Sequence, residues 1–254
     1  MYLKISIAIM PQNEKQHLDY RMNINYQFSV NADTYGRYNI IQQHVAKYLI
    51  EKIANNPSNI IDIGCGRGAV FNAIDWGLNG FLGIDFSKEM LDLHPVTQCV
   101  KLRQKDFNQQ GWLQDIDGRQ YDRVISASAL QWATDLERTF IDIKQLNAPV
   151  SLAIFTSGTF KTLHQVASVS ALLRSAEEVQ QFAEKHFSAT IETVRYTLKF
   201  DTVREMFRYI KKTGVSGARN VLSFQQTKAL MNNYPLDHLE FEVVFIHEGR
   251  RNRQ

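Results

Sequence analysis

Three glycines and an aspartate stand close together at residues 62–68, where the sequence is DIGCGRG. Gly64, Gly66 and Gly68 occupy alternate positions after a β-branched run and before a stretch with helical spacing. Glycine lets the backbone turn sharply and approach a ligand closely, because no Cβ intervenes. The pattern predicts a strand, a tight turn and a helix, with a ligand-binding loop at the turn.

The glycine spacing and the preceding acid indicate which ligand this loop holds. The dinucleotide-binding pattern is G-x-G-x-x-G, whereas this loop is G-x-G-x-G with Asp62 two residues before its first glycine. The positive end of a helix suits a pyrophosphate, but an aspartate at the mouth of the loop suits a ligand with an ammonium and a sulfonium. We expect Asp62, the three glycines and the intervening Cys65 to line its site.

Two further acids follow predicted strands. Asp85 ends the strand GFLGID, where its carboxylate can accept hydrogen bonds from both hydroxyls of a ribose. Asp106 ends the next strand, where it can accept from an adenine amino group while Phe107 covers the ring. Ligands of open α/β sheets bind at the carboxyl ends of strands. The predicted adenosyl pocket therefore includes Asp85, Phe86, Asp106, Phe107 and Ser126.

Strands and helices alternate around these residues. Apolar runs and period-2 alternation predict strands at 59–64, 80–85, 98–103, 121–128, 149–157, 189–200 and 239–247. Helical spacing predicts helices at 40–53, 69–78, 87–93, 134–147, 202–212 and 223–234, and helical structure between 159 and 187. We expect Ser87 and either Thr134 or Asp135 to be N-caps. The alternation predicts an α/β fold, a Rossmann-like, doubly wound, seven-stranded and mostly parallel sheet with a helical lid insertion.

The predicted elements divide the chain into one domain and a terminal segment on each side of it. Residues 26–247 are expected to form one domain, with 1–25 an N-terminal extension outside it and 248–254 a basic tail. Within the domain, 26–156 form the cofactor-binding core and 236–247 the last strand. Residues 157–235 are longer than a simple crossover connection, which predicts a lid and substrate region above the sheet.

Composition narrows the functional class. The chain has 254 residues, 44% hydrophobic and 22% charged, and a formal net charge of +3, which is too small to indicate a nucleic-acid partner. Two cysteines, Cys65 and Cys99, are too few for a disulfide framework or a zinc site. The apolar residues 3–10 are too short to span a membrane. We expect a cytoplasmic monomer without metal, membrane or nucleic-acid partner.

Taken together, the glycine loop and the acid that ends the second strand resemble the class I S-adenosylmethionine-dependent methyltransferases, over about residues 40–156. The resemblance implies S-adenosylmethionine as the cofactor and S-adenosylhomocysteine as the product. It also implies that the cofactor lies in the pocket predicted above.

Four segments are similar to a narrower family, the malonyl-[acyl carrier protein] O-methyltransferases of early biotin synthesis. They are FSVNADTYGRYNIIQQ at 28–43, SASALQW at 126–132, FTSGTFKTLHQ at 155–165 and VREMFRYIKKTGVSG at 203–217. This resemblance implies methylation of the free carboxylate of a malonyl thioester, carried on acyl carrier protein or coenzyme A. The methyl ester then primes pimeloyl synthesis.

The narrower resemblance also suggests residues for the acceptor side. It implies that Tyr35 closes the methyl-donor end and that Trp132 contacts the substrate. A guanidinium can hold a carboxylate by directional hydrogen bonds and leave one oxygen free, which makes Arg204 the expected anchor. An acidic carrier protein would meet a basic rim, for which Lys211, Lys212 and Arg219 are the candidates.

Three other functions remain open from the residues alone. One is another small-molecule methyltransferase, acting on a different carboxylate or on a quinone-type carbon, because the fold does not fix the substrate. Another is a dinucleotide-dependent oxidoreductase, which the glycine spacing and Asp62 disfavour. The last is a non-catalytic protein that binds the cofactor.

Overall fold

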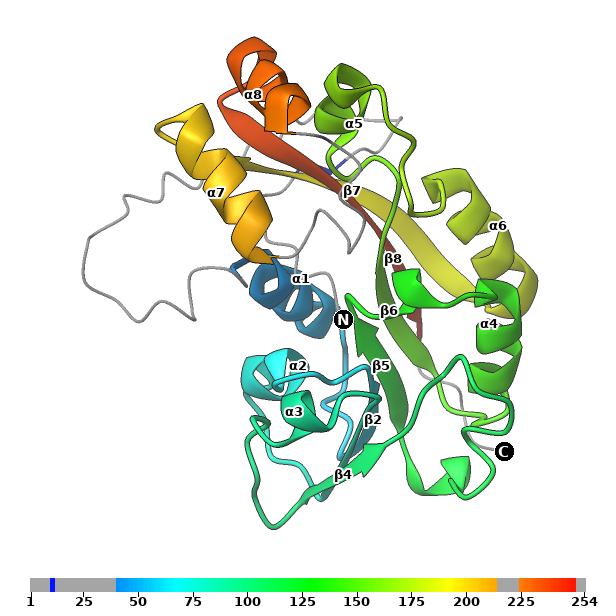
Figure 1. The fold of residues 1–254 in the computed structure, drawn as a ribbon. Coiled ribbons are helices and arrows are strands. Elements are labelled where there is room, and N and C mark those ends of the chain that lie inside the picture. The colour runs from blue at the N-terminus through cyan, green and yellow to red at the C-terminus, as the bar shows by residue number, and fades with distance from the viewer. Residues whose placement is uncertain (1–9, 12–39, 214–223, 250–254) are drawn as a thin grey trace.

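The computed structural model describes residues 10–11, 40–213 and 224–249, in which the strands form a single sheet (Figure 1). Along the chain, its main strands are β2 (Asn59–Ile63), β3 (Gly80–Asp85), β4 (Val100–Gln104), β5 (Arg123–Ala127), β6 (Val150–Phe155), β7 (Ala189–Lys199) and β8 (His238–Glu248). Their order across the sheet is β7-β8-β6-β5-β2-β3-β4. Each of these seven strands overlaps a predicted one.

Strands β4, β3, β2, β5 and β6 are parallel, whereas β8 is antiparallel to both of its neighbours. The chain crosses from one side of the sheet to the other between β4 and β5, where the strand order reverses. Open α/β sheets bind ligands at such a switch point. The predicted seven-stranded, mostly parallel sheet is confirmed. An eighth, two-residue strand, β1 (Met10–Pro11), pairs with β7 within the predicted N-terminal extension and was not predicted.

The helices between the strands are α1 (Ile40–Glu51), α2 (Ala69–Ala73), α3 (Lys88–Leu91), α4 (Leu136–Lys144), α5 (Lys161–Ala167), α6 (Ala176–His186), α7 (Val203–Thr213) and α8 (Phe224–Asn233). Ser87 caps α3 by accepting from the backbone N–H of Met90, and Asp135 caps α4 in the same way. Both are predicted caps. Helix α2 ends five residues before the predicted boundary, where the chain becomes extended at Ile74.

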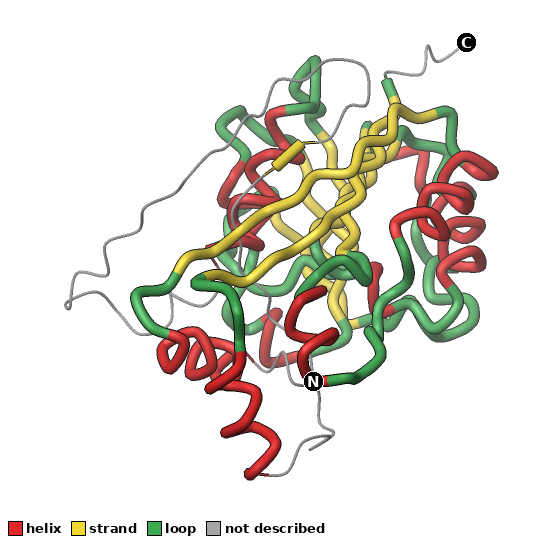
Figure 2. Tube along the Cα trace, turned by 90° about the horizontal axis from the view of Figure 1, so that it is seen from above, coloured by secondary structure: helices red, strands yellow, loops and turns green. Residues whose placement is uncertain are grey.

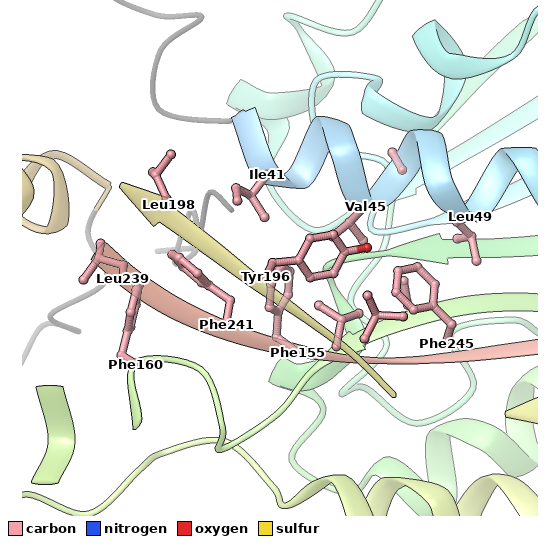
Figure 3. Packing of buried hydrophobic residues seen from close by; sticks show 14 of the residues in the cluster. Ile41, Val45, Leu49, Phe155, Phe160, Tyr196, Leu198, Leu239, Phe241 and Phe245 are labelled. Carbon is pink, nitrogen blue, oxygen red and sulfur yellow. The ribbon is translucent and has the colours of Figure 1, made fainter. Parts of the chain in front are cut away.

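Helices cover both faces of the sheet, as Figure 2 shows. On one face, α1 packs Ile41, Val45 and Leu49 against aromatic side chains of the sheet, including Tyr196 and Phe245 (Figure 3). On the other face, α4 and α6 pack onto a second core cluster. Since both faces are buried, the central strands are almost continuously apolar, and each fully buried Leu, Ile or Phe contributes about 1.5–3 kcal/mol.

The predicted lid region, residues 157–235, has two parts. Strand β7 pairs with β8 along its whole length, and α6 packs beside α4, so these two elements belong to the sheet layers and not to a lid. Helices α5, α7 and α8 gather instead beyond the edge at which β6 and β7 end (Figure 1). The lid prediction is therefore corrected for α6 and β7, and it remains a prediction for the other three helices. None of the helices that the structure describes is long and apolar enough to cross a membrane.

Candidate functional site

The glycine loop between β2 and α2 has the backbone geometry that its sequence predicts. Gly64, Gly66 and Gly68 all have positive φ angles, of 73°, 52° and 86°. A Cβ on Gly64 would lie 2.1 Å from the Cβ of Ala129, whereas a Cβ on Gly66 would have no neighbour within 4 Å. Gly64 is thus required by packing against the β5 exit loop, and Gly66 leaves open space beside the backbone.

Asp85 ties the end of β3 to this loop. Its carboxylate is 3% exposed, and its two oxygens accept hydrogen bonds of 2.9 Å from the backbone N–H groups of Gly66 and Ser87. Burial raises the pKa of Asp85, although both hydrogen bonds act in the opposite direction. Each oxygen keeps a second lone pair, so the carboxylate can hold the loop and still accept from a ligand hydroxyl.

Asp62 is the most unusual group at the site. It is completely buried in β2, and neither carboxylate oxygen has a hydrogen-bond partner among the residues that the structure describes. Burial, and next the charge of Asp85, raise the pKa of Asp62 well above its ordinary range. A buried carboxylate without partners is costly, which indicates that a cationic or hydrogen-bond-donating ligand completes the site.

Cys65 and Gly68 contribute packing. The Cys65 thiol is buried beside Gly83 of β3, and burial raises its pKa, so the thiol stays protonated. A Cβ on Gly68 would lie 2.7 Å from Cδ of Pro95 and 3.1 Å from Nε2 of His94, which leaves no room for a larger residue. Of the predicted loop residues, Asp62 thus keeps two carboxylate oxygens without a described partner, and Gly66 has open space beside its backbone.

The two residues predicted to contact an adenine, Asp106 and Phe107, lie just after β4. Asp106 is half-buried beyond the end of β4, and its Oδ1 accepts from the backbone N–H of Asn108 at 2.8 Å. Phe107 is buried in the second core cluster, where its ring meets Trp112 edge-on at 6.4 Å. The ring thus packs in the core, and its predicted contact with an adenine stays a prediction. Phe86, next to Asp85, is half-buried.

Two serines at the end of β5, Ser126 and Ser128, have different surroundings. Ser126 is completely buried in β5, and its hydroxyl donates to the carbonyl of Ile63 at 2.7 Å, which joins β5 to β2. Its predicted cofactor contact stays a prediction. Ser128 follows the strand with a positive φ of 63°, and its buried hydroxyl has no partner among the described residues. A non-glycine residue in this strained conformation often marks a functional position. The prediction overlooked Ser128.

The β5 exit loop continues into a short 3-10 helix, Leu130–Trp132. Gln131 donates from Nε2 to the carbonyl of Ser128, and its buried Oε1 has no partner within the described part of the chain. The indole N–H of Trp132 is also buried and without a partner there. The loop, whose Ala129 packs against Gly64, thus carries three buried polar groups without a partner among the described residues, of which only Trp132 was predicted.

The predicted acceptor residues lie mostly on or beyond α7. Arg204 is exposed on that helix, whose opposite side buries Met206, Tyr209 and Ile210 in the first core cluster. No hydrogen bond or ion pair joins Arg204 to another described residue. Tyr35 and Arg219 lie outside the described residues, as do the side chains of Lys211 and Lys212. Among the described residues, no group of three or more His, Cys, Asp or Glu side chains could hold a metal ion.

Comparison with known proteins shows that the central part of the chain matches a protein family. The family model described as "Methyltransferase domain" matches residues 61–155, from the glycine loop to the end of β6. The chain is a methyltransferase. This identification removes the dinucleotide-dependent oxidoreductase from the alternatives.

Relatives and a solved structure extend the comparison. A malonyl-[acyl-carrier protein] O-methyltransferase of Halorhodospira halophila is 24% identical to the enzyme over 235 residues, covering 82% of this chain and 76% of the relative. A protein of the same name from Priestia megaterium is 27% identical over 255 residues, covering 83% and 88%. The structure of Haemonchus contortus phosphoethanolamine N-methyltransferase 2 with S-adenosyl-L-methionine has a TM-score of 0.50 and 16% identity, covering 82% of this chain and 52% of that one. The predicted resemblance and the class I methyltransferase fold are confirmed.

Proposed function

We propose that the enzyme transfers a methyl group from S-adenosylmethionine to the free carboxylate of a malonyl thioester, carried on acyl carrier protein or coenzyme A. The main support for this acceptor is the length of chain over which the relatives match. Two relatives named for this reaction match more than four fifths of the chain, well beyond the general methyltransferase domain at 61–155. The match is therefore not confined to the segment that carries the cofactor loop.

The residues at the glycine loop fit S-adenosylmethionine. Asp62 offers two buried oxygens without partners to a cationic ligand, and the open space beside Gly66 lets a ligand lie against the backbone. Asp85 keeps lone pairs for ribose hydroxyls, and Asp106 lies beyond the next strand end for an amino group. When bound, this cofactor supplies a methyl group on a sulfonium, which a nucleophile can attack directly.

The acceptor chemistry requires positioning more than acid–base catalysis. A carboxylic acid with an ordinary pKa near 4 is ionised at neutral pH, so its oxygen can attack without a general base. The protein must align that oxygen with the methyl group and exclude water, which can lower a barrier by roughly 7–11 kcal/mol. The orphaned polar groups of Ser128, Gln131 and Trp132 border the loop on which such alignment depends.

Arg204 and Tyr35 are proposed for the reacting end of the acceptor. A guanidinium on α7 would hold the malonyl carboxylate, and its exposure leaves it free of competing described partners. Too complete a pairing would reduce the nucleophilicity of the oxygen it holds, so one oxygen must stay free. Tyr35 would close the methyl-donor end, and Lys211, Lys212 and Arg219 would form the rim that meets an acidic carrier.

A methyl-transfer assay with the full chain tests the proposed function. We expect S-adenosylmethionine and malonyl-carrier protein or malonyl-coenzyme A to give a methyl ester, detected by mass spectrometry of the acyl group. Glutaryl and acetyl thioesters serve as controls for the length of the acid and for the free carboxylate. Equal methylation of the glutaryl control, or no transfer to either malonyl thioester, would contradict the proposed acceptor.

A further inference from the structure

A cavity of about 440 Å³ lies beside α5, beyond the end of β6. It is bounded by residue 157 after β6, by one side of α5 and by the connection at 168–171. Hydrogen-bonding side chains from all three segments line it, namely Ser157, Lys161, His164, Gln165, Ser168 and Ser170. No residue that lines the cavity is acidic. A cavity with one ammonium and several neutral donors is suited to an anion.

The two basic side chains of the cavity are available to a ligand. No ion pair joins Lys161 to another described residue, and His164 has a buried Nδ1 that makes no hydrogen bond within the described part of the chain. Burial lowers the pKa of His164, so at neutral pH the imidazole is a neutral donor or acceptor while Lys161 supplies the charge.

The carboxylates nearest to α5 are already engaged by other groups. Glu240 accepts a 2.8 Å hydrogen bond from the backbone N–H of Thr162. Glu242 accepts from the hydroxyl of Thr156 at 2.7 Å and forms an ion pair with Arg195 at 2.8 Å. Neither acid lines the cavity, so neither neutralises Lys161 from within it.

A series of hydrogen bonds connects the edge of the cavity to the loop after β4. The backbone N–H of Ser157 donates to the carbonyl of Arg174, whose guanidinium donates to the carbonyl of Thr134 at 2.9 Å. The backbone N–H of Thr134 donates in turn to Oδ1 of Asn108, and that of Asn108 donates to Asp106. The segment that borders the cavity is thus connected, through Arg174, Thr134 and Asn108, to the loop after β4 that carries Asp106.

We propose that this cavity binds the phosphate ester on the carrier arm of the acceptor. The inference rests on the proposed function, because acyl carrier protein and coenzyme A both hold their acyl group on a phosphopantetheine arm. The thioester is at one end of that arm and the phosphate at the other. A phosphate site apart from the methyl-donor site is what such an extended acceptor requires. Lys161 binds the phosphate as a point charge, and the serine hydroxyls and His164 donate to its oxygens.

Steady-state kinetics of Lys161→Gln with three acceptors test this site. We expect KM to rise about tenfold for malonyl-carrier protein and malonyl-coenzyme A, with little change in kcat, because one charged contact to bound substrate is lost. Malonyl-N-acetylcysteamine lacks the phosphate, and its KM should not change. Lys228→Gln is the matched control, since Lys228 is an exposed lysine on the adjacent helix α8. An equal rise for all three acceptors, no rise for any of them, or the same rise in the control would overturn the assignment.

A binding measurement separates failure of this site from failure of the proposed function. Phosphopantetheine should raise the thermal midpoint of the wild-type enzyme, while pantetheine should not, and Lys161→Gln should abolish the shift. A shift in the wild type alone supports the site even if no malonyl thioester is methylated. A shift with inorganic phosphate as large as that with phosphopantetheine would instead assign the cavity to free phosphate and contradict the carrier-arm proposal.

Discussion

The proposed cofactor side and the proposed acceptor side of this enzyme are built in different ways. On the cofactor side, the main determinants lie within 24 residues, from Asp62 to Asp85, and the backbone itself forms much of the site. On the acceptor side, polar groups come from the β5 exit loop, α5 and α7, which are separated by long stretches of chain. Local backbone geometry therefore defines the first site, while side chains brought together by packing define the second.

Asp85, on the proposed cofactor side, and Arg204, on the proposed acceptor side, illustrate this difference. Asp85 is held by two backbone N–H groups of the glycine loop and the β3 exit, so its position follows from the turn. Arg204 extends from an exposed helix face without a described partner, so its position depends on what it binds. A preorganised site loses little entropy on binding, whereas a flexible side chain must be ordered by its ligand.

Two glycine substitutions in the same loop should have different effects, one mainly on stability and the other mainly on cofactor affinity. Gly64→Ala would place a Cβ 2.1 Å from that of Ala129 in addition to a positive φ, and we expect a loss of about 2–4 kcal/mol in the free energy of unfolding. Gly66→Ala meets no neighbour, so we expect a loss of about 1 kcal/mol for its positive φ but at least about a 100-fold weaker affinity for S-adenosylmethionine.

Chemical denaturation and titration calorimetry on the two variants measure these effects. The two variants differ most clearly if Gly66→Ala remains folded but shows no detectable cofactor binding. If Gly66→Ala binds S-adenosylmethionine as the wild type does, the loop is not the site of the cofactor.

Arg204→Ala should affect only the acceptor side. Loss of a charged hydrogen bond to the malonyl carboxylate is expected to lower kcat/KM by about 100-fold, since such bonds are worth about 1.5–3 kcal/mol. Cofactor affinity should stay unchanged. Arg208→Ala, an exposed arginine on the same helix, is the matched control. Similar losses in both variants would indicate a general effect of charge on α7, and unchanged turnover of Arg204→Ala would reject its role as the anchor.

Asp62→Asn should give the smallest change. It tests whether protonation of Asp62 affects both the free energy of unfolding and cofactor binding. Burial raises the pKa of Asp62 in the folded enzyme, so the folded state holds this proton more tightly than the unfolded chain does. The free energy of unfolding should therefore fall as pH rises from about 4 toward the raised pKa. The asparagine variant has no such proton, so without cofactor it should be more stable than the wild type at pH 8, and its affinity for the cationic cofactor should fall about tenfold.

Denaturation at pH 5 and pH 8, followed by cofactor titration, tests both parts. Binding to the wild type should release a proton, because a cationic ligand favours the ionised carboxylate, and titration in buffers of different ionisation enthalpy detects that release. Parallel pH profiles for wild type and variant would show that Asp62 does not titrate as inferred.

The strand pattern and the glycine loop could be predicted from sequence because each depends on a short segment. The alternation of apolar runs gives the order of elements, and glycine at positions 64, 66 and 68 matches the positive φ found at each. The burial of Phe107 in a core cluster and the bond from Ser126 to Ile63 could not be predicted in this way, because both depend on residues from other elements. Ser128 was missed because a positive φ at serine has no signature in residue type.

The sequence by itself determined that β-strands alternate with helices and that acids stand at strand ends near a glycine turn, because period, glycine and turn chemistry act over a few residues. Only the tertiary structure decided which polar groups stay unsatisfied. Ser126 donates to Ile63, which lies 63 residues earlier in the chain, whereas both oxygens of Asp62 find no described partner. Whether a buried group is satisfied depends on its neighbours in space, and those neighbours come from strands and helices far apart in the chain.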